Sequence, residues 1–340
     1  MTGSTGSTSR GNRPLVVVTG AGGFIGGHLV ASLVDQGGCQ IRAIDARPTD
    51  SWLQCFEGVD NRQLDLTENP ACAEAVAGAT RIFNLASDMG GIGFIENNKA
   101  ACMLSVLINT HLLQAAQRQG VERYFFASSA CVYPQGKQDV ADVVPLRESD
   151  AYPAMPEDGY GWEKLFSERM CRHFSEDFGL PTRVARFHNI YGPHGTFDGG
   201  REKAPAAICR KVAHAKLSGN HEIELWGDGE QTRSFTYIDD CLHGMQLIVD
   251  GDVSRPLNVG SSELVTINGL VDIVERIAGI KVRRHHRLDA PLGVRGRNSD
   301  NTLIRQLLHW APSITLECGM EHTFRWVYDR IAADGGARVA

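Results

Sequence analysis

The sequence lacks any run of the roughly 18 consecutive apolar residues that a membrane-spanning helix requires, so we expect no membrane association. It also lacks an excess of basic residues: 34 Lys and Arg stand against 40 Asp and Glu, and the net charge of −6 argues against nucleic-acid binding. The nine cysteines are odd in number and scattered, and neither a CxxC nor an HExxH motif is present. We therefore expect reduced thiols in a cytoplasmic protein, with no disulfide framework and no metal site.

Two segments have a biased composition. Residues 1–13 are rich in Ser, Thr and Gly, and we predict a disordered tail that is neither a signal peptide nor an anchor. The segment KVRRHHR (281–287) is basic, and we interpret it as a solvated, anion-facing patch rather than as a metal site. The remaining chain is long and apolar enough to bury a sizeable core in one large domain or two moderate ones.

The first half of the chain alternates strand-like and helix-like patterns. This alternation predicts an α/β fold, a Rossmann-type doubly wound parallel sheet with helices on both faces. Its strands are expected at 15–20, 40–45, 81–86, 123–129 and 182–187, and its helices at about 23–36, 70–77, 98–119 and 160–178.

After Arg186 the pattern changes to Gly- and Pro-rich stretches between short helices. We predict a first domain over residues 14–188 and a smaller C-terminal substrate-binding α/β lobe, mainly 189–335, that covers the carboxyl ends of the strands. Residues 228–258 are expected to return to the first domain.

The stretch TGAGGFIGGH follows the first predicted strand and opens a predicted helix. Such glycines let the backbone turn sharply and approach a pyrophosphate, which binds the free N–H groups of the helix N-terminus. A turn that is glycine-rich only for tight packing is the alternative. We assign dinucleotide binding to Gly20, Gly22, Gly23, Phe24, Ile25 and Gly26.

Acidic residues follow the next two strands. Asp45 closes the second strand, where a carboxylate binds a ribose 2′-hydroxyl and repels a 2′-phosphate, so we predict NAD rather than NADP. Arg47 lies nearby and leaves NADP as an alternative. Asp65 is placed to reach the adenine edge, or else to cap a turn.

Tyr160 and Lys164 lie four residues apart at the start of a predicted helix, and therefore on one face. A neighbouring ammonium favours the phenolate form of a tyrosine, and the same lysine can hold the nicotinamide ribose. A solvated helix face is the alternative. Ser129 ends the fifth strand, where a ligand crevice forms in such sheets.

The chain resembles the extended short-chain dehydrogenase/reductase family in TGAGGFIG, the acid ending strand two, the serine pair ending strand five, YGWEK and RFHNIYGP. Members act mostly on nucleotide sugars with tightly held NAD. The resemblance implies that Tyr160 takes the proton of the sugar 4-hydroxyl while Ser129 orients that oxygen, as hydride passes from C4 to NAD⁺ and later returns.

Where dehydratases of this family carry an Asp-Glu pair, this chain has Ala130 and Cys131. Six stretches between residues 14 and 330 instead resemble the family of GDP-mannose 3,5-epimerases. They are LASDMGGIGFIENN, SSACVYP, RFHNIYGPHGT, GGREKAPAAICRK, WGDGEQTRSF and GVRGRNSDN.

This second resemblance implies that Cys131 and Lys203 are an acid/base pair on opposite faces of the sugar. The cysteine, partly thiolate, is the base at carbon, and the lysine, protonated by default, is the acid. Core packing for Cys131 and a surface position for Lys203 are the alternatives.

The remaining substrate contacts follow from the same resemblance. We predict a diphosphate and nucleotide clamp, since guanidinium groups suit phosphate oxygens. The clamp consists of Lys211, Arg233, Arg295 and Arg297, and the other substrate-binding residues are Gly90, Gly91, Asn189, Glu202, Gln231 and Thr232.

The predicted activity is that of an isomerase that converts GDP-D-mannose, through a transient 4-ketone, to GDP-L-galactose, GDP-L-gulose or both. One alternative is another NAD-dependent epimerase or 4-ketoreductase acting on a related GDP- or UDP-sugar. A remote alternative is a non-catalytic NAD-binding regulator. The resemblance also implies a homodimer through helices 98–119 and 160–178, whose apolar stripes could otherwise serve core packing.

Overall fold

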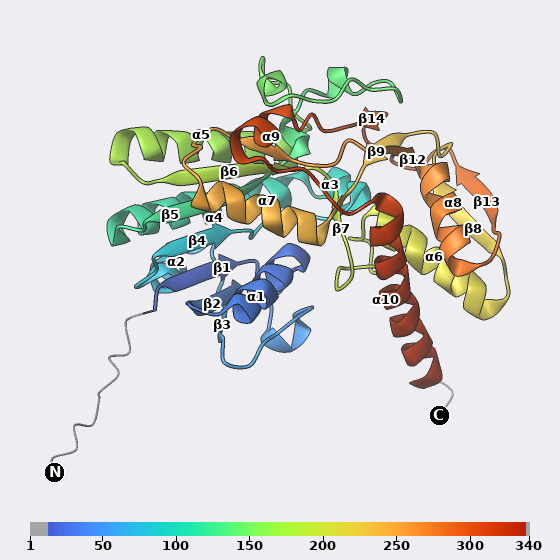
Figure 1. The fold of residues 1–340 in the computed structure, drawn as a ribbon, viewed down its shortest axis with the longest axis horizontal. Helices are drawn as coiled ribbons and strands as arrows, with labels where there is room; N and C mark the ends of the chain where they lie inside the picture. The colour runs from blue at the N-terminus through green and yellow to red at the C-terminus, as the bar shows by residue number, and fades with distance from the viewer. Residues whose placement is uncertain (1–12, 338–340) are drawn as a thin grey trace, which may run out of the picture.

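A seven-stranded sheet forms the centre of the computed structural model, which describes residues 13–337 (Figure 1). Its order is β11-β6-β5-β4-β1-β2-β3, and all neighbours are parallel. The order reverses between β1 and β4, which creates a crevice at the carboxyl ends. The predicted doubly wound sheet is confirmed. Its strands are β1 (Leu15–Thr19), β2 (Gln40–Asp45), β3 (Asp60–Gln63), β4 (Arg81–Asn84), β5 (Arg123–Ser129), β6 (Thr182–Phe187) and β11 (Leu257–Val259).

Helices cover both faces of this sheet, which is why its central strands β1, β4 and β5 are largely apolar without alternation, whereas the edge strand β3 (DNRQ) is polar. Val16 and Val18 of β1 enter the core on one face, whereas Val17 enters a separate core on the other. The helices α1 (Phe24–Gln36) and α7 (Ile238–Asp250) cover the first face. The second is covered by α2 (Asn69–Val76), α4 (Lys99–Gln119) and α5 (Tyr160–Phe178). The four helices predicted in the first half match these bounds to within about one residue.

The predicted smaller α/β lobe lies beside the sheet, on the right of Figure 1. Its helices α6 (Ala204–Ser218), α8 (Ile267–Ala278) and α10 (Leu316–Ala337) pack on one another. The strand β8 (Glu222–Trp226) pairs in parallel with β13 (Arg283–Arg287). A small mixed sheet consists of β12 (Leu264–Thr266), β9 (Thr232–Ser234) and β14 (Gly296–Arg297).

The chain passes between the two parts more than once. Within residues 228–258, α7 packs on the sheet and β11 pairs with β6. The helix α9 (Thr302–Leu308) also contacts β11, a return that we did not predict. Between the parts, β7 (Ile190–Tyr191) pairs with β10 (Thr236–Tyr237). The carboxyl ends of the strands therefore face segments from several regions of the sequence.

The basic segment KVRRHHR is mostly exposed, as predicted, and an anion-facing role for it stays a prediction. Most of it forms β13, whose Arg283 and His285 lie 3.6 and 3.3 Å from carboxylate oxygens of Glu222 on the paired strand β8. Arg284 lies 3.2 Å from Glu275 of α8. Carboxylates from two neighbouring elements thus balance its charge.

The predicted disordered tail, residues 1–13, lies outside the described residues except for Arg13. Across residues 13–337, none of the helices combines the length and the apolar character needed to cross a bilayer.

Candidate active site

The glycine loop leaves β1 where the sheet order reverses and leads directly into α1. Gly20 has a φ of +68°, which residues with a Cβ rarely adopt. A Cβ on Gly26 would lie 2.2 Å from the carbonyl oxygen of Gly20, so α1 can approach the loop this closely only with glycine there. Gly23 is the N-cap of α1, and Phe24 and Ile25 form its first turn, whose free N–H groups suit a pyrophosphate.

Asp45 lies at the end of β2, next to this loop. Its Oδ2 accepts a hydrogen bond from the N–H of Gly22 at 3.1 Å. Its Oδ1 accepts from the backbone N–H and the Nε of Arg47 at 3.0 and 3.1 Å. The positive charge of Arg47 is therefore paired with the carboxylate, and a 2′-phosphate here would meet a negative group. The loop and this carboxylate fit NAD.

Asp65 follows β3 on an exposed turn. Its Oδ1 accepts hydrogen bonds from the backbone N–H and the hydroxyl of Thr67 at 2.9 and 2.7 Å. These contacts correspond to the turn-capping alternative, and contact with adenine stays a prediction.

Tyr160 and Ser129 meet at the carboxyl end of the sheet, because one begins α5 and the other ends β5. The hydroxyl of Ser129 lowers the pKa of Tyr160, which places the two side chains close together. The Nζ of Lys164 lies 5.4 Å from the centre of the Tyr160 ring and 3.3 Å from Oε2 of Glu163, and it is almost fully buried. Burial raises the pKa of Tyr160 well above its usual value, and Cys131 and Glu163 raise it further. Burial therefore opposes the phenolate, and the ammonium of Lys164 is paired with Glu163, so the predicted lowering by Lys164 stays a prediction.

Cys131 lies in the short 3₁₀ turn Ala130–Val132 that follows β5, and its N–H donates to Oγ of Ser129 at 3.2 Å. Its side chain is buried, with 7% of the residue exposed. Lys203, from the second lobe, is the half-buried N-cap of α6, and its charge interacts with Cys131. Lys203 is thus close enough to Cys131 for their charges to interact, although the two residues come from different lobes, and their action as an acid/base pair stays a prediction.

The protonation states of this pair differ from those that we expected. Burial raises the pKa of Cys131 to about 11; Glu157 raises it further and Arg297 opposes the shift. Burial also lowers the pKa of Lys203. Burial thus opposes the predicted partial thiolate, and it also weakens the charge of the amine, because desolvation disfavours the charged form of both groups. The roles of the two residues stay predictions.

The four predicted clamp residues do not form one group. Arg233 and Arg297 are adjacent in the β9–β14 pair, and burial, followed by the charge of Arg297, lowers the pKa of Arg233 to about 10. Arg295 instead pairs with Asp228 at 2.8 Å on the surface. Lys211 donates to a backbone carbonyl of β8 at 2.6 Å. The structure thus supports an inner pair of arginines and two outer cations.

The predicted sugar-lining residues come from two loops in contact. The N–H of Gly91 donates to the carbonyl of Arg201 at 3.0 Å, and a Cβ on Gly91 would lie 2.4 Å from the carbonyl oxygen of Glu202. Gly90 precedes this contact, just before the short helix α3 (Ile92–Asn97). The carboxylate of Glu202 pairs with Arg210 at 3.0 Å rather than with the acid/base pair.

The other predicted substrate-binding residues are engaged by the second lobe. Asn189, with a φ of +47°, donates from Nδ2 to the carbonyl of Ser234 at 2.9 Å. Gln231 and Thr232 are buried where β9 begins, and the Nε2 of Gln231 donates to the carbonyl of Trp226 at 3.1 Å. Contact of these side chains with substrate stays a prediction.

The sequence analysis missed two residues that surround Cys131. Glu157 and Gln138 are both buried, and both contact the guanidinium of Arg297. They lie in the stretches PEDGY and QGKQD, which carry no recognised motif. Glu157 and Gln138 are 140 and 159 residues from Arg297 in the sequence, and contacts between such distant positions produce no pattern in a single sequence.

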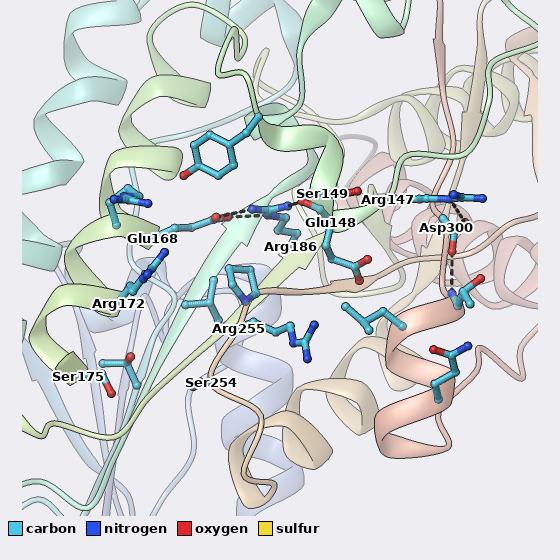
Figure 2. Close-up of a pocket in the computed structure, with 18 of the residues that line it drawn as sticks. Arg147, Glu148, Ser149, Glu168, Arg172, Ser175, Arg186, Ser254, Arg255 and Asp300 are labelled. Atoms are coloured by element: carbon cyan, nitrogen blue, oxygen red, sulfur yellow. Dashed lines mark hydrogen bonds and ion pairs between the residues drawn. The ribbon is translucent and has the colours of Figure 1, made fainter.

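An arginine-rich cavity of about 880 Å³ lies elsewhere, between α5, β6, α9 and the loops around residues 147–152 and 254–256 (Figure 2). None of the predicted site residues lines it. At its floor Arg186 pairs with Glu168 at 2.7 Å, and both side chains are buried. Arg147 pairs with Asp300 at 3.3 Å at its rim. Because its lining contains none of the predicted site residues, the cavity is separate from the predicted site.

Comparison with protein families gives a match over residues 16–260 to the model of the NAD dependent epimerase/dehydratase family. A curated relative from Oryza sativa subsp. japonica, "GDP-mannose 3,5-epimerase 1", is 44% identical over 317 residues, which cover 93% of this chain and 82% of the relative. "GDP-mannose 3,5-epimerase" of Arabidopsis thaliana is 43% identical with the same coverage.

Solved structures share the fold. The UDP-glucose 4-epimerase of Thermotoga maritima, solved with UDP-glucose, has a TM-score of 0.83 at 22% identity and covers 93% of this chain and 99% of its own. The UDP-glucuronic acid 4-epimerase of Bacillus cereus, in complex with UDP-glucuronic acid and NAD, has a TM-score of 0.79 at 22% identity, with 93% and 99% coverage.

Proposed function

The chain belongs to the NAD-dependent epimerase/dehydratase family, and we propose that it is a GDP-mannose 3,5-epimerase that uses bound NAD. The observation that carries this proposal is the buried cluster that holds Cys131 and Tyr160 at the carboxyl end of the sheet, with Lys203 close enough for its charge to act on the thiol. Epimerisation at carbon needs two groups that exchange protons with the sugar, in addition to a group that handles the 4-hydroxyl proton.

The glycine loop and Asp45 are the residues that would hold NAD. Two positions of the glycine loop have no room for a side chain. A Cβ on Gly22 would lie 2.7 Å from the ring of Trp52, and a Cβ on Gly26 would clash with the backbone of Gly20. The backbone of the loop is therefore free to approach the pyrophosphate. When bound there, NAD supplies a reversible hydride acceptor for C4 of the sugar.

Tyr160 is the proposed base for the sugar 4-hydroxyl, and Ser129, which lies close to it, is proposed to orient that hydroxyl. Because burial keeps the tyrosine protonated in this structure, proton uptake requires positive charge close to its oxygen. Lys164 provides such a charge if its pairing with Glu163 weakens.

Cys131 and Lys203 are the proposed proton-transfer groups at C5 and C3. A ketone at C4 acidifies the protons on both neighbouring carbons, so a thiolate can remove them and an ammonium can return a proton. Inversion at C5 alone gives GDP-L-gulose, and inversion at both centres gives GDP-L-galactose.

The alternatives from the sequence are less well supported. The chain is 44% identical to a GDP-mannose 3,5-epimerase, but only 25% identical to UDP-glucuronic acid decarboxylase 1 of Arabidopsis thaliana and to a GDP-L-colitose synthase of Yersinia pseudotuberculosis. A non-catalytic regulator would not need the buried group of Cys131, Lys203 and Tyr160.

A homodimer through α4 and α5 is part of this proposal. The two helices pack side by side, and their outer faces expose Met103, Leu104 and Leu107 of α4 and Trp162 and Phe166 of α5. Large apolar side chains gathered on one face of a soluble protein mark an interface. A second copy of the chain, packed through the same two helices, would cover them.

The test is isotope exchange in D₂O. Purified protein incubated with GDP-mannose is expected to place deuterium at C5 and C3, measured by NMR and mass spectrometry. Exchange with UDP-sugars but not with GDP-mannose would replace the proposed substrate, and absence of exchange with every nucleotide sugar would contradict an epimerase.

A further inference from the structure

Arg297 is fixed by three buried groups. Its Nε donates to Oε1 of Gln138 at 2.7 Å, its Nη1 lies 3.6 Å from Sγ of Cys131, and its Nη2 pairs with a carboxylate oxygen of Glu157. The amide of Gln138 cannot turn freely, since its Nε2 donates to the carbonyls of Tyr133 and Pro134 at 3.3 and 3.2 Å. The guanidinium therefore has one position, and that position is against the thiol.

Glu157 contacts both members of the Arg297–Cys131 pair. Its backbone N–H donates to the carbonyl of Cys131 at 3.0 Å, while its side chain pairs with Arg297. The side chains of Glu157 and Arg297 are only 11% and 7% exposed. A buried ion pair costs desolvation and is weak evidence of a stabilising role, so its place beside a reactive thiol calls for a functional explanation.

We propose that Glu157 is a positioning residue that holds Arg297 against Cys131 and balances its charge, so that the thiol stays protonated until the charges around it change. This inference rests on the proposed function of Cys131 in proton transfer. Glu157 itself exchanges no proton with the sugar in this account; it acts through Arg297.

The charges around Cys131 predict how a change at Glu157 alters the pKa of the thiol. The charged groups facing the thiol are Arg297 from β14, Glu157 from the loop before α5, Arg233 from β9 and Lys203 at the start of α6, with the neutral Tyr160 beside them. Arg297 favours the thiolate by charge and by a hydrogen bond, and Glu157 opposes it. Removing the charge of Glu157 while keeping an acceptor for Arg297 should therefore favour the thiolate.

Glu157→Gln makes that change, and the measurement is the pH dependence of alkylation of Cys131 by iodoacetamide, followed on its peptide by mass spectrometry in the full chain. The pH at which Cys131 is half-reactive is expected to fall by about one unit or more, because the variant removes a negative charge that lies close to the thiolate. Glu157→Asp keeps the charge and is expected to keep the midpoint. The exposed Cys55 is an internal control whose profile should not move in any variant.

An unchanged Cys131 midpoint in Glu157→Gln overturns the proposal, as does an equal shift at Cys55. If Glu157→Gln does not fold, the variant Arg297→Lys is measured in its place. An ammonium group cannot contact Gln138, Glu157 and Cys131 at the same time, so the pH midpoint of Cys131 alkylation should rise. An unchanged midpoint in Arg297→Lys overturns the proposal. Because alkylation needs no sugar, this result is independent of the deuterium test. With GDP-mannose, Glu157→Gln should change kcat and the pH profile of exchange more than KM.

Discussion

Nη1 of Arg297 lies 3.6 Å from Sγ of Cys131, although 166 residues separate them in sequence. A cysteine after a buried strand is most often packing. Here the thiol is in contact with a guanidinium and close to the charge of Lys203, which marks it as a candidate for chemistry. Cys131 and Cys171 are both buried, so the neighbouring positive charges, and not burial, distinguish Cys131 from a thiol that only packs in the core.

Cys131→Ala is expected to lower deuterium exchange at C5 and C3 by a factor of about 10²–10⁴, the usual effect of losing a proton-transfer group. NAD should stay bound, because the thiol lies outside the glycine loop. The matched control is Cys171→Ala, which removes another buried thiol, packed between α4 and α5. Full exchange by Cys131→Ala would show that the thiol only packs.

Asp45 is expected to make the protein select NAD. The carboxylate accepts hydrogen bonds from Gly22 and Arg47, so a 2′-phosphate would meet negative charge. Protein denatured after purification should release NAD, measured by chromatography, and Asp45→Ala should release less of it and tolerate NADP. Arg47→Ala, the control, should still release NAD. Recovery of mainly NADP from the unaltered protein would contradict this assignment.

Gly26→Ala is expected to disrupt the cofactor site. The new Cβ would lie 2.2 Å from the carbonyl oxygen of Gly20, so α1 must move away from the loop. We expect a loss of about 1–3 kcal/mol in the free energy of unfolding and weaker NAD retention. Gly136→Ala is the control, since the nearest atom to its Cβ would be 3.9 Å away. Equal thermal stability of the two variants would argue against the tight contact.

His188 is expected to make stability depend on pH. It is fully buried, and burial lowers its pKa from the ordinary value of 6.5 to about 3. Between these values the unfolded chain binds the proton and the folded chain does not, so stability is present above pH 6.5 and falls as the pH decreases. The loss between pH 7 and pH 5 is about 2 kcal/mol.

Urea unfolding at the two pH values measures this difference. His188→Gln should remove about 2 kcal/mol of the pH dependence, whereas His221→Gln, at an exposed position, should leave it unchanged. The same pH dependence in His188→Gln and in the unaltered protein would assign the effect to other groups.

Leu104→Glu is expected to break the proposed homodimer, because it places a charge in the apolar face of α4 and α5. Leu104 is 57% exposed in the single chain. Light scattering after size exclusion should give twice the chain mass for the unaltered protein and one chain mass for the variant. Leu288→Glu changes a residue that is 72% exposed on the second lobe and should keep the dimer. A monomeric unaltered protein would end the dimer proposal.

The first half of the fold was predictable because its signals are local. Five strands of the sheet lie in short runs that are predicted from sequence, and α5 is predicted at residues 160–178 as observed, whereas the polar edge strand β3 (DNRQ) and the short strand β11 are not predicted. The glycine loop and Asp45 were also found from sequence, since their spacing depends only on the β1–α1–β2 unit.

The charge balance of the site was not predictable in this way. The raised pKa of Tyr160 depends on burial and on neighbours that only the folded chain brings together, and so does the pairing of Lys164 with Glu163. The separation of the predicted clamp residues into an inner and an outer group also depends on tertiary contacts. Arg295 pairs with Asp228, 67 residues away in the sequence, whereas Arg297 contacts Cys131 in the interior. Such contacts follow from tertiary packing, for which one sequence gives no signal.

The pairing of β6 with β11 has a consequence for synthesis on the ribosome. When β6 (Thr182–Phe187) has emerged, the strand that covers its outer edge, Leu257–Val259, has still to be translated, and α6, β8, β9 and α7 lie between them in the sequence. Until then the nascent sheet presents β6 as an open edge strand, although all six of its residues are buried in the folded protein, and such an edge is the kind of surface that recruits other chains. Slow translation of that interval, or a ribosome stalled within it, should therefore yield aggregates, and chaperones that bind extended apolar segments should protect the growing chain at this stage.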